Sequence, residues 1–156
     1  MLLDVAERLP SIDFTMVGGK LPDAPELYEE AAARAAALPN VAFLGSVPFN
    51  EMGELYARAQ VLVCTSEIEG FPNTFLQAWA SGTPVVSTVD ADGVIATHRL
   101  GTVCEAPDEM ADEIEVVLSE AASSRELGDR CRGYVQEHHG PDVVVRKLDG
   151  LLRKAL

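Results

Sequence analysis

Short apolar runs alternate with helical patterns along the whole of this sequence. The strand-like runs cover residues 12–17, 41–44, 61–64, 84–87 and 100–104, and the segments between them space apolar residues at helical intervals. Strands that alternate with helices are typical of a parallel sheet, because each return connection needs a crossover element. The sequence therefore predicts an α/β fold with a doubly wound, Rossmann-like parallel sheet.

The helical segments carry recognisable start signals and run to the end of the chain. Three helices are predicted after the last strand, beginning at Pro107, at a Ser123-x-x-Glu126 capping box and at Pro141. No internal repeat, low-complexity segment or linker interrupts the pattern. Residues 1–156 are therefore predicted to form one domain.

The chain is strongly acidic, with 12 Lys and Arg residues against 25 Asp and Glu residues and a formal net charge of −13. A nucleic-acid partner is excluded by this balance, because phosphate binding needs a basic face. Few lysines and many carboxylates favour adaptation to high salt, where screening relieves self-repulsion. An ordinary acidic domain is the alternative.

Location, cysteines and metals are constrained only weakly. No apolar run approaches the ~20 residues that span a bilayer, and the start lacks a signal-peptide pattern, so a cytoplasmic location is expected. Cys64, Cys104 and Cys131 have no paired spacing and are expected to be reduced core thiols. No carboxylate cluster has metal-binding spacing, and no metal is expected.

The segment 66–87 combines an acidic turn, a short amphipathic helix, a Gly-Thr-Pro turn and an apolar strand. Asn73 is placed to cap the helix, whose first amides would point at an anion such as phosphate. Glu69 precedes the helix and Gln77 lies one turn inside it, so the two can flank one ligand. The core-facing positions predicted for this helix are Phe75, Leu76, Trp79 and Ala80.

Ligands in open α/β sheets bind beyond the carboxyl ends of the strands. Four loops of this sequence meet that condition, and they cover residues 18–20, 45–48, 66–73 and 87–93. All four contain glycine, which lets backbone approach a ligand closely. The sequence therefore predicts a ligand site where these loops meet.

The stretch 69–86 resembles the donor-binding motif of family 4 glycosyltransferases, retaining enzymes of the GT-B fold. In that family a glutamate opens the motif and a second glutamate closes it; Glu69 matches the first and Gln77 occupies the second position. The resemblance implies that Glu69 binds hydroxyls of the donor sugar and acts in catalysis, and that Gln77 binds the ribose. It assigns the diphosphate to Gly70, Phe71, Pro72, Asn73 and Thr74, and the base to Gly45 and Val47.

The resemblance covers nearly the whole chain and implies the carboxyl-terminal, nucleotide-sugar-binding half of a two-domain enzyme. The implied reaction transfers a hexosyl-type sugar from a nucleoside diphosphate sugar to an unidentified acceptor, with no cofactor besides this donor. An amino-terminal domain would bind the acceptor, and it could also bring the protein to the inner membrane surface. Without that domain the chain is expected to be inactive, and a binding module or a truncated remnant without turnover is the alternative. A Rossmann dehydrogenase is disfavoured, because no Gly-x-Gly-x-x-Gly turn follows the first strand.

The sequence departs from the family pattern in two places. Gln77 replaces an acid and offers no charge-assisted bond to the ribose. The family's donor domain opens with a strand and then an Arg and Lys clamp on the diphosphate, whereas residues 1–6 match the helix after that strand. The runs 12–17 and 61–64 would then face a gap. We expect either a closed gap with altered strand order or self-association through the exposed edge.

Simpler interpretations stand beside these assignments. Glu69 could be a solvated loop acid, and Gln77 an ordinary surface residue of a helix. His98, His138 and His139 have no metal-type partners nearby in the sequence, and positions at the surface or behind the ligand-contacting residues are expected for them rather than a role in catalysis. The pair 138–139 is expected to end a helix, where cationic side chains are favoured.

Overall fold

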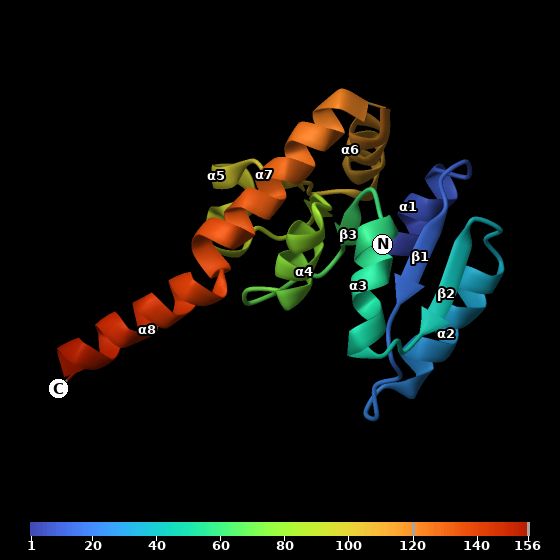
Figure 1. The fold of residues 1–156 in the computed structure, drawn as a ribbon. Helices are drawn as coiled ribbons and strands as arrows, with labels where there is room; N and C mark the ends of the chain where they lie inside the picture. Colours follow the sequence, from blue (N-terminus) through green and yellow to red (C-terminus); the bar gives the residue numbers. More distant parts are fainter. Residues whose placement is uncertain (120, 156) are drawn as a thin grey trace.

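The computed structural model describes residues 1–119 and 121–155, in which strands alternate with helices as the sequence predicts (Figure 1). The strands are β1 (Phe14–Val17), β2 (Val41–Gly45), β3 (Leu62–Cys64), β4 (Val85–Ser87) and β5 (Gly101–Val103). The helices are α1 (Leu2–Arg8), α2 (Pro25–Ala36), α3 (Phe49–Arg58), α4 (Asn73–Ser81), η1 (Ala91–Gly93), α5 (Val94–His98), α6 (Pro107–Ser119), α7 (Ala121–His139) and α8 (Pro141–Ala155). The α/β fold with parallel strands and Rossmann-like character is confirmed.

The strands form two separate parallel sheets. One sheet pairs β1 with β2, and the other has the order β3-β4-β5. Among the described residues no strand lies between β1 and β3, and the two are not hydrogen-bonded to each other. The gap predicted between the runs 12–17 and 61–64 is therefore present. It is not closed by altered strand order, and self-association through the edge stays a prediction.

Helices cover both faces of the three-stranded sheet, as a doubly wound arrangement requires. Val85 of β4 packs in a cluster with α3, α4 and α7, whereas its neighbour Val86 packs in a second cluster with α1 and α6. Alternate residues of a strand point to opposite faces, so β3 and β4 each contribute to both clusters. Trp79 is completely buried, which confirms its predicted place in the core.

Helix α1 connects the two sheets. Its residues Val5 and Leu9 pack in the second cluster together with Phe14 of β1 and Val63 of β3. The buried amide of Asn40, just before β2, donates to the carbonyl oxygens of Ala6, Leu9 and Ile12, each at 3.0 Å. Side chains and one amide thus hold the sheets together where strand pairing does not.

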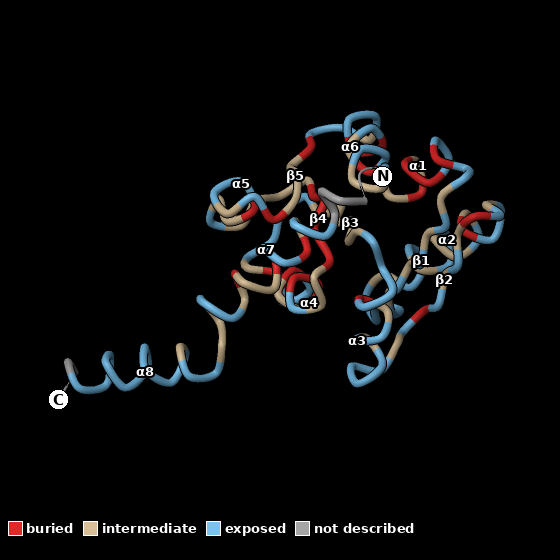
Figure 2. The backbone as a smooth tube through the Cα atoms, turned by 45° about the horizontal axis from the view of Figure 1, so that its top comes forward, coloured by how far each residue is buried: buried red, intermediate tan, exposed pale blue. Residues whose placement is uncertain are grey.

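The carboxyl-terminal helices begin close to their predicted positions. Helix α8 begins at Pro141 and α6 at Pro107, as expected. Helix α7 begins at Ala121, and the side chain of Ser123, in the predicted capping box, lies outside the described residues. Helix α8 extends away from the rest of the chain (Figures 1 and 2). Its exposed apolar residues are Val144, Val145, Leu148, Leu151 and Leu152.

The structure also describes the state of the three cysteines and the apolar length of the helices. Cys104 and Cys131 are buried and Cys64 is half-buried, and all three are free thiols. Burial raises the pKa of the Cys131 thiol to about 12, and burial with Glu109 and Glu113 raises that of Cys104 to about 11. Both thiols therefore stay protonated and unreactive. No described helix is long and apolar enough to cross a membrane.

Candidate functional site

The loop between β3 and α4 carries the motif, and hydrogen bonds fix its shape. The Ser66 hydroxyl donates to the Glu69 carboxylate over 2.7 Å, so Glu69 is held directly before the helix although it is exposed to solvent. The Thr88 hydroxyl, in the loop after β4, donates to the Ser66 carbonyl oxygen at 2.6 Å. The loops after β3 and β4 therefore meet, as the sequence predicts.

Helix α4 begins at Asn73, one residue earlier than a capping role for Asn73 would require. Pro72 is the N-cap residue, and its carbonyl oxygen accepts the amide of Phe75 at 3.1 Å. Pro72 already supplies the non-helical turn, so the expectation that Asn73 caps the helix is wrong. The first amides of a helix have no acceptor within it, which leaves those of Asn73 and Thr74 open. Both residues are exposed, and the helix dipole makes this end attractive to an anion.

The opposite face of α4 fixes the helix in the core. Phe75, Ala78 and Trp79 are buried, and the Trp79 indole donates to the Leu100 carbonyl oxygen at 3.2 Å. Phe75 and Trp79 are in the core as predicted, and Leu76 is half-buried against it. The prediction for Ala80 is wrong, because Ala80 is exposed and Ala78 is buried instead. Gln77 is half-buried one turn after Asn73, on the side predicted for it.

The predicted base-binding residues lie on the other sheet. Gly45 ends β2 with φ +67°, and a Cβ there would come within 2.8 Å of the Tyr28 hydroxyl, so only glycine fits. Its carbonyl oxygen accepts the Gly18 amide at 2.9 Å, which joins the loops after β1 and β2. Val47, two residues further on, is half-buried. No hydrogen bond described by the structure links these loops to the motif loop, so the four loops form two pairs.

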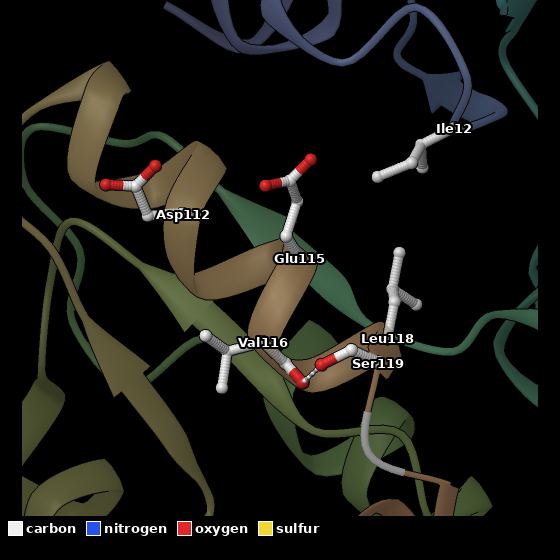
Figure 3. A pocket seen from close by; sticks show the side chains of 6 residues that line it. All are labelled: Ile12, Asp112, Glu115, Val116, Leu118 and Ser119. Carbon is white, nitrogen blue, oxygen red and sulfur yellow. Dashed lines mark hydrogen bonds between the residues drawn. The ribbon is translucent and has the colours of Figure 1, made fainter.

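Two surface hollows lie away from the motif. The larger, about 670 Å³, is lined by Ile12, Asp112, Glu115, Val116, Leu118 and Ser119 (Figure 3). Its two carboxylates would repel a diphosphate, and Ile12 precedes β1, away from the carboxyl ends of the strands. The smaller, about 160 Å³, adjoins Gly18 and Gly19. Gly18 and Gly19 belong to a loop predicted to adjoin the ligand, whereas none of the residues from Glu69 to Gln77 lines either of these two hollows.

The segment after β4 contains a helix that the sequence analysis did not predict. The Asp90 carboxylate accepts the amides of Ile95 at 2.8 Å and of Ala96 at 3.1 Å, which fixes the start of α5. Asp92 and Gly93, the last two residues of η1, adopt left-handed conformations. The Asp-x-Asp-Gly sequence is the local signal that could have indicated this turn. No group of His, Cys, Asp and Glu among the described residues could hold a metal ion.

Comparison with known proteins places this fold and motif in one family. The family model described as "Glycosyl transferases group 1" matches residues 1–120. The chain therefore belongs to the group 1 glycosyl transferases. A curated relative, an uncharacterized glycosyltransferase of Methanocaldococcus jannaschii, is 27% identical over 138 residues, covering 86% of this chain and 35% of that protein.

Solved structures share the fold at low sequence identity. Anabaena HepE, crystallised in complex with UDP, has a TM-score of 0.85 at 18% identity, over 98% of this chain and 44% of that one. Sucrose-phosphate synthase of Thermosynechococcus elongatus has a TM-score of 0.77 at 22% identity, over 99% and 42%. The carboxyl-terminal domain of the group 1 protein LpcC of Francisella tularensis has a TM-score of 0.75 at 20% identity, over 90% and 78%. This chain thus spans less than half the length of HepE, of the synthase and of the curated relative.

Proposed function

We propose that this chain is the donor-binding, carboxyl-terminal half of a retaining glycosyltransferase that uses a nucleoside diphosphate sugar. The observation that carries the proposal is the open amino-terminal end of α4, with a carboxylate fixed just before it. The amides of Asn73 and Thr74 and the carboxylate of Glu69 are complementary to a diphosphate and to sugar hydroxyls, respectively. The fold of this chain covers 78% of the LpcC carboxyl-terminal domain with a TM-score of 0.75, which supports the assignment to the carboxyl-terminal half.

The roles of the residues follow from their charges. A carboxylate repels phosphate, so Glu69 would face the sugar while the helix amides take the diphosphate. Negative charge builds on the diphosphate as the glycosidic bond breaks, and the positive end of the α4 dipole would stabilise it. Gln77 would contact the ribose from one turn inside the helix, with Gly45 and Val47 beside the base. The sugar is of hexosyl type in this proposal.

The test compares a nucleotide sugar with its bare nucleotide. UDP-glucose and UDP are titrated into the protein and into Glu69→Ala, with Glu26→Ala, an exposed acid in the first turn of α2, as the matched control. Losing a charge-assisted hydrogen bond costs about 1.5–3 kcal/mol, which is roughly a 10- to 150-fold weaker affinity. We expect this loss for UDP-glucose, a much smaller change for UDP, and none in the control. Equal weakening of both ligands would show that Glu69 does not contact the sugar.

A binding module without turnover is the second candidate. It is favoured by the exposure of Glu69, Asn73 and Thr74 to solvent in this chain. Supplying an amino-terminal half of a group 1 enzyme in trans and assaying sugar transfer and donor hydrolysis distinguishes the two. Turnover above that of either half supports the enzyme, whereas donor binding without turnover supports the module.

A further inference from the structure

All three histidines of the chain gather around one tyrosine, where α5, α7 and α8 come together. The ring of Tyr134 is 8% exposed, and its centroid lies 4.7 Å from those of His98 and His138 and 5.5 Å from that of His139. His98 ends α5, whereas the other three residues belong to α7. We call these four residues the histidine–tyrosine cluster.

The cluster contacts the motif loop through Phe71. The ring of His139 lies 5.8 Å from that of Phe71, and His139 Nε2 is 3.3 Å from the Tyr134 hydroxyl. Phe71 also packs edge-on against Trp79, with centroids 6.4 Å apart, and Trp79 packs against Tyr134 at 5.5 Å. Phe71 stands next to Pro72, the N-cap of α4. A movement of His139 would therefore be passed through Phe71 to Pro72 and to the open amides at the start of α4.

The charged groups around the cluster come from α8 and η1. Lys147 of α8 donates to the His138 carbonyl oxygen at 3.2 Å. Burial lowers the pKa of His139, and Lys147 and His138 add to this effect. Burial raises the pKa of Tyr134, with a smaller contribution from Asp92 of η1. The residues facing the cluster from α4 and from the motif loop, Trp79 and Phe71, are uncharged.

We propose that the histidine–tyrosine cluster is a proton-sensitive brace that positions the motif loop and makes donor binding depend on pH; this rests on the proposed donor site. Neutral His139 packs on Phe71 and bonds Tyr134, which holds Pro72 in place. Protonation of His139 places a cation against the ring of Phe71 and near Lys147, and a charged imidazole draws water into the contact. His139 then loses its contact with Phe71, and the motif loop no longer holds Pro72 and the first amides of α4 in position to bind the donor.

The test uses Trp79, the single tryptophan of the chain, which lies against the cluster and reports on it without any ligand. Trp79 fluorescence and UDP affinity are followed from about pH 7.5 to about pH 5.5, the range in which histidine titrates. The variant His139→Phe keeps an aromatic ring and cannot be protonated. Glu137→Gln, an exposed position on the same helix, is the control and should behave like the wild type.

Because the terminal phosphate of UDP itself titrates near pH ~6, the diagnostic quantity is the difference between wild type and His139→Phe. We expect the wild-type Kd to rise about threefold more than that of the variant, the scale of one aromatic contact, and the Trp79 emission to change only in the wild type. Equal Kd changes, or an emission step that persists in the variant, refute the brace alone. No UDP binding by the wild type at any pH refutes the donor site as well. If circular dichroism shows that His139→Phe does not fold, His139→Gln replaces it in the same comparison.

Discussion

Replacing Asn40 by alanine tests how strongly one side chain fixes α1, the helix that packs between the two sheets, to the start of β2. Asn40 is 7% exposed, and its amide nitrogen serves three carbonyl oxygens, each at 3.0 Å, in α1 and just before β1. Its two N–H groups limit the loss to about two full hydrogen bonds. The Ile12 carbonyl loses the donor described for it, which costs about 1–3 kcal/mol, whereas the carbonyls of Ala6 and Leu9 keep a backbone amide and lose about 0.5–1.5 kcal/mol. We therefore expect Asn40→Ala to lower the free energy of unfolding by roughly 2–4 kcal/mol. That is a large share of the ~5–15 kcal/mol of a typical domain.

Two further variants make the measurement decisive. Asn40→Asp has nearly the same shape but places carboxylate oxygens against carbonyl oxygens, so at neutral pH it should destabilise more than alanine does. Asn50→Ala, at an exposed position of α3, should change the free energy by no more than about 0.5 kcal/mol. Urea unfolding followed by circular dichroism measures all three. The reasoning is refuted if the free energy of unfolding of Asn40→Ala lies within ~0.5 kcal/mol of the wild-type value, or if Asn40→Asp is as stable as the wild type.

Three other outcomes follow from the same structure. The pKa of His139 is lowered in the folded state, so its contribution to stability is present above about pH 6.5 and lost as pH falls toward the folded pKa; His139→Phe should flatten that part of a plot of unfolding free energy against pH. The net charge of −13 predicts a melting temperature that rises between ~0.01 M and ~1 M potassium chloride, and a flat response would remove the case for adaptation to high salt. The amides of Thr15 in β1 and Val63 in β3 point away from the strands that pair with them in the described part of the chain. They should therefore exchange with solvent faster than the amide of Val86 in the central strand β4. Association of copies through these edges would slow the exchange, and a concentration series in analytical ultracentrifugation detects such association.

Local sequence patterns determined much of this protein. Proline at 107 and 141 marked the starts of α6 and α8, and helical spacing placed Trp79 in the core. Alternation of strands and helices gave the α/β class. These features depend on neighbours within a turn or a few residues, so periodicity and turn chemistry reveal them. The motif around Glu69 was recognisable for the same reason, because its residues are contiguous in sequence.

Tertiary structure alone decided how these elements meet. The two sheets stay unpaired between β1 and β3 because pairing depends on which edges lie adjacent in space, and no local pattern encodes that. The start of α4 moved to Asn73 because the Pro72 carbonyl oxygen accepts the Phe75 amide there. The sequence did not predict that His98 lies beside Tyr134 and His138, because only the packing of α5 against α7 brings these residues together. Contacts between residues far apart in the chain form only when burial of the shared core offsets the entropy of closing the loop between them.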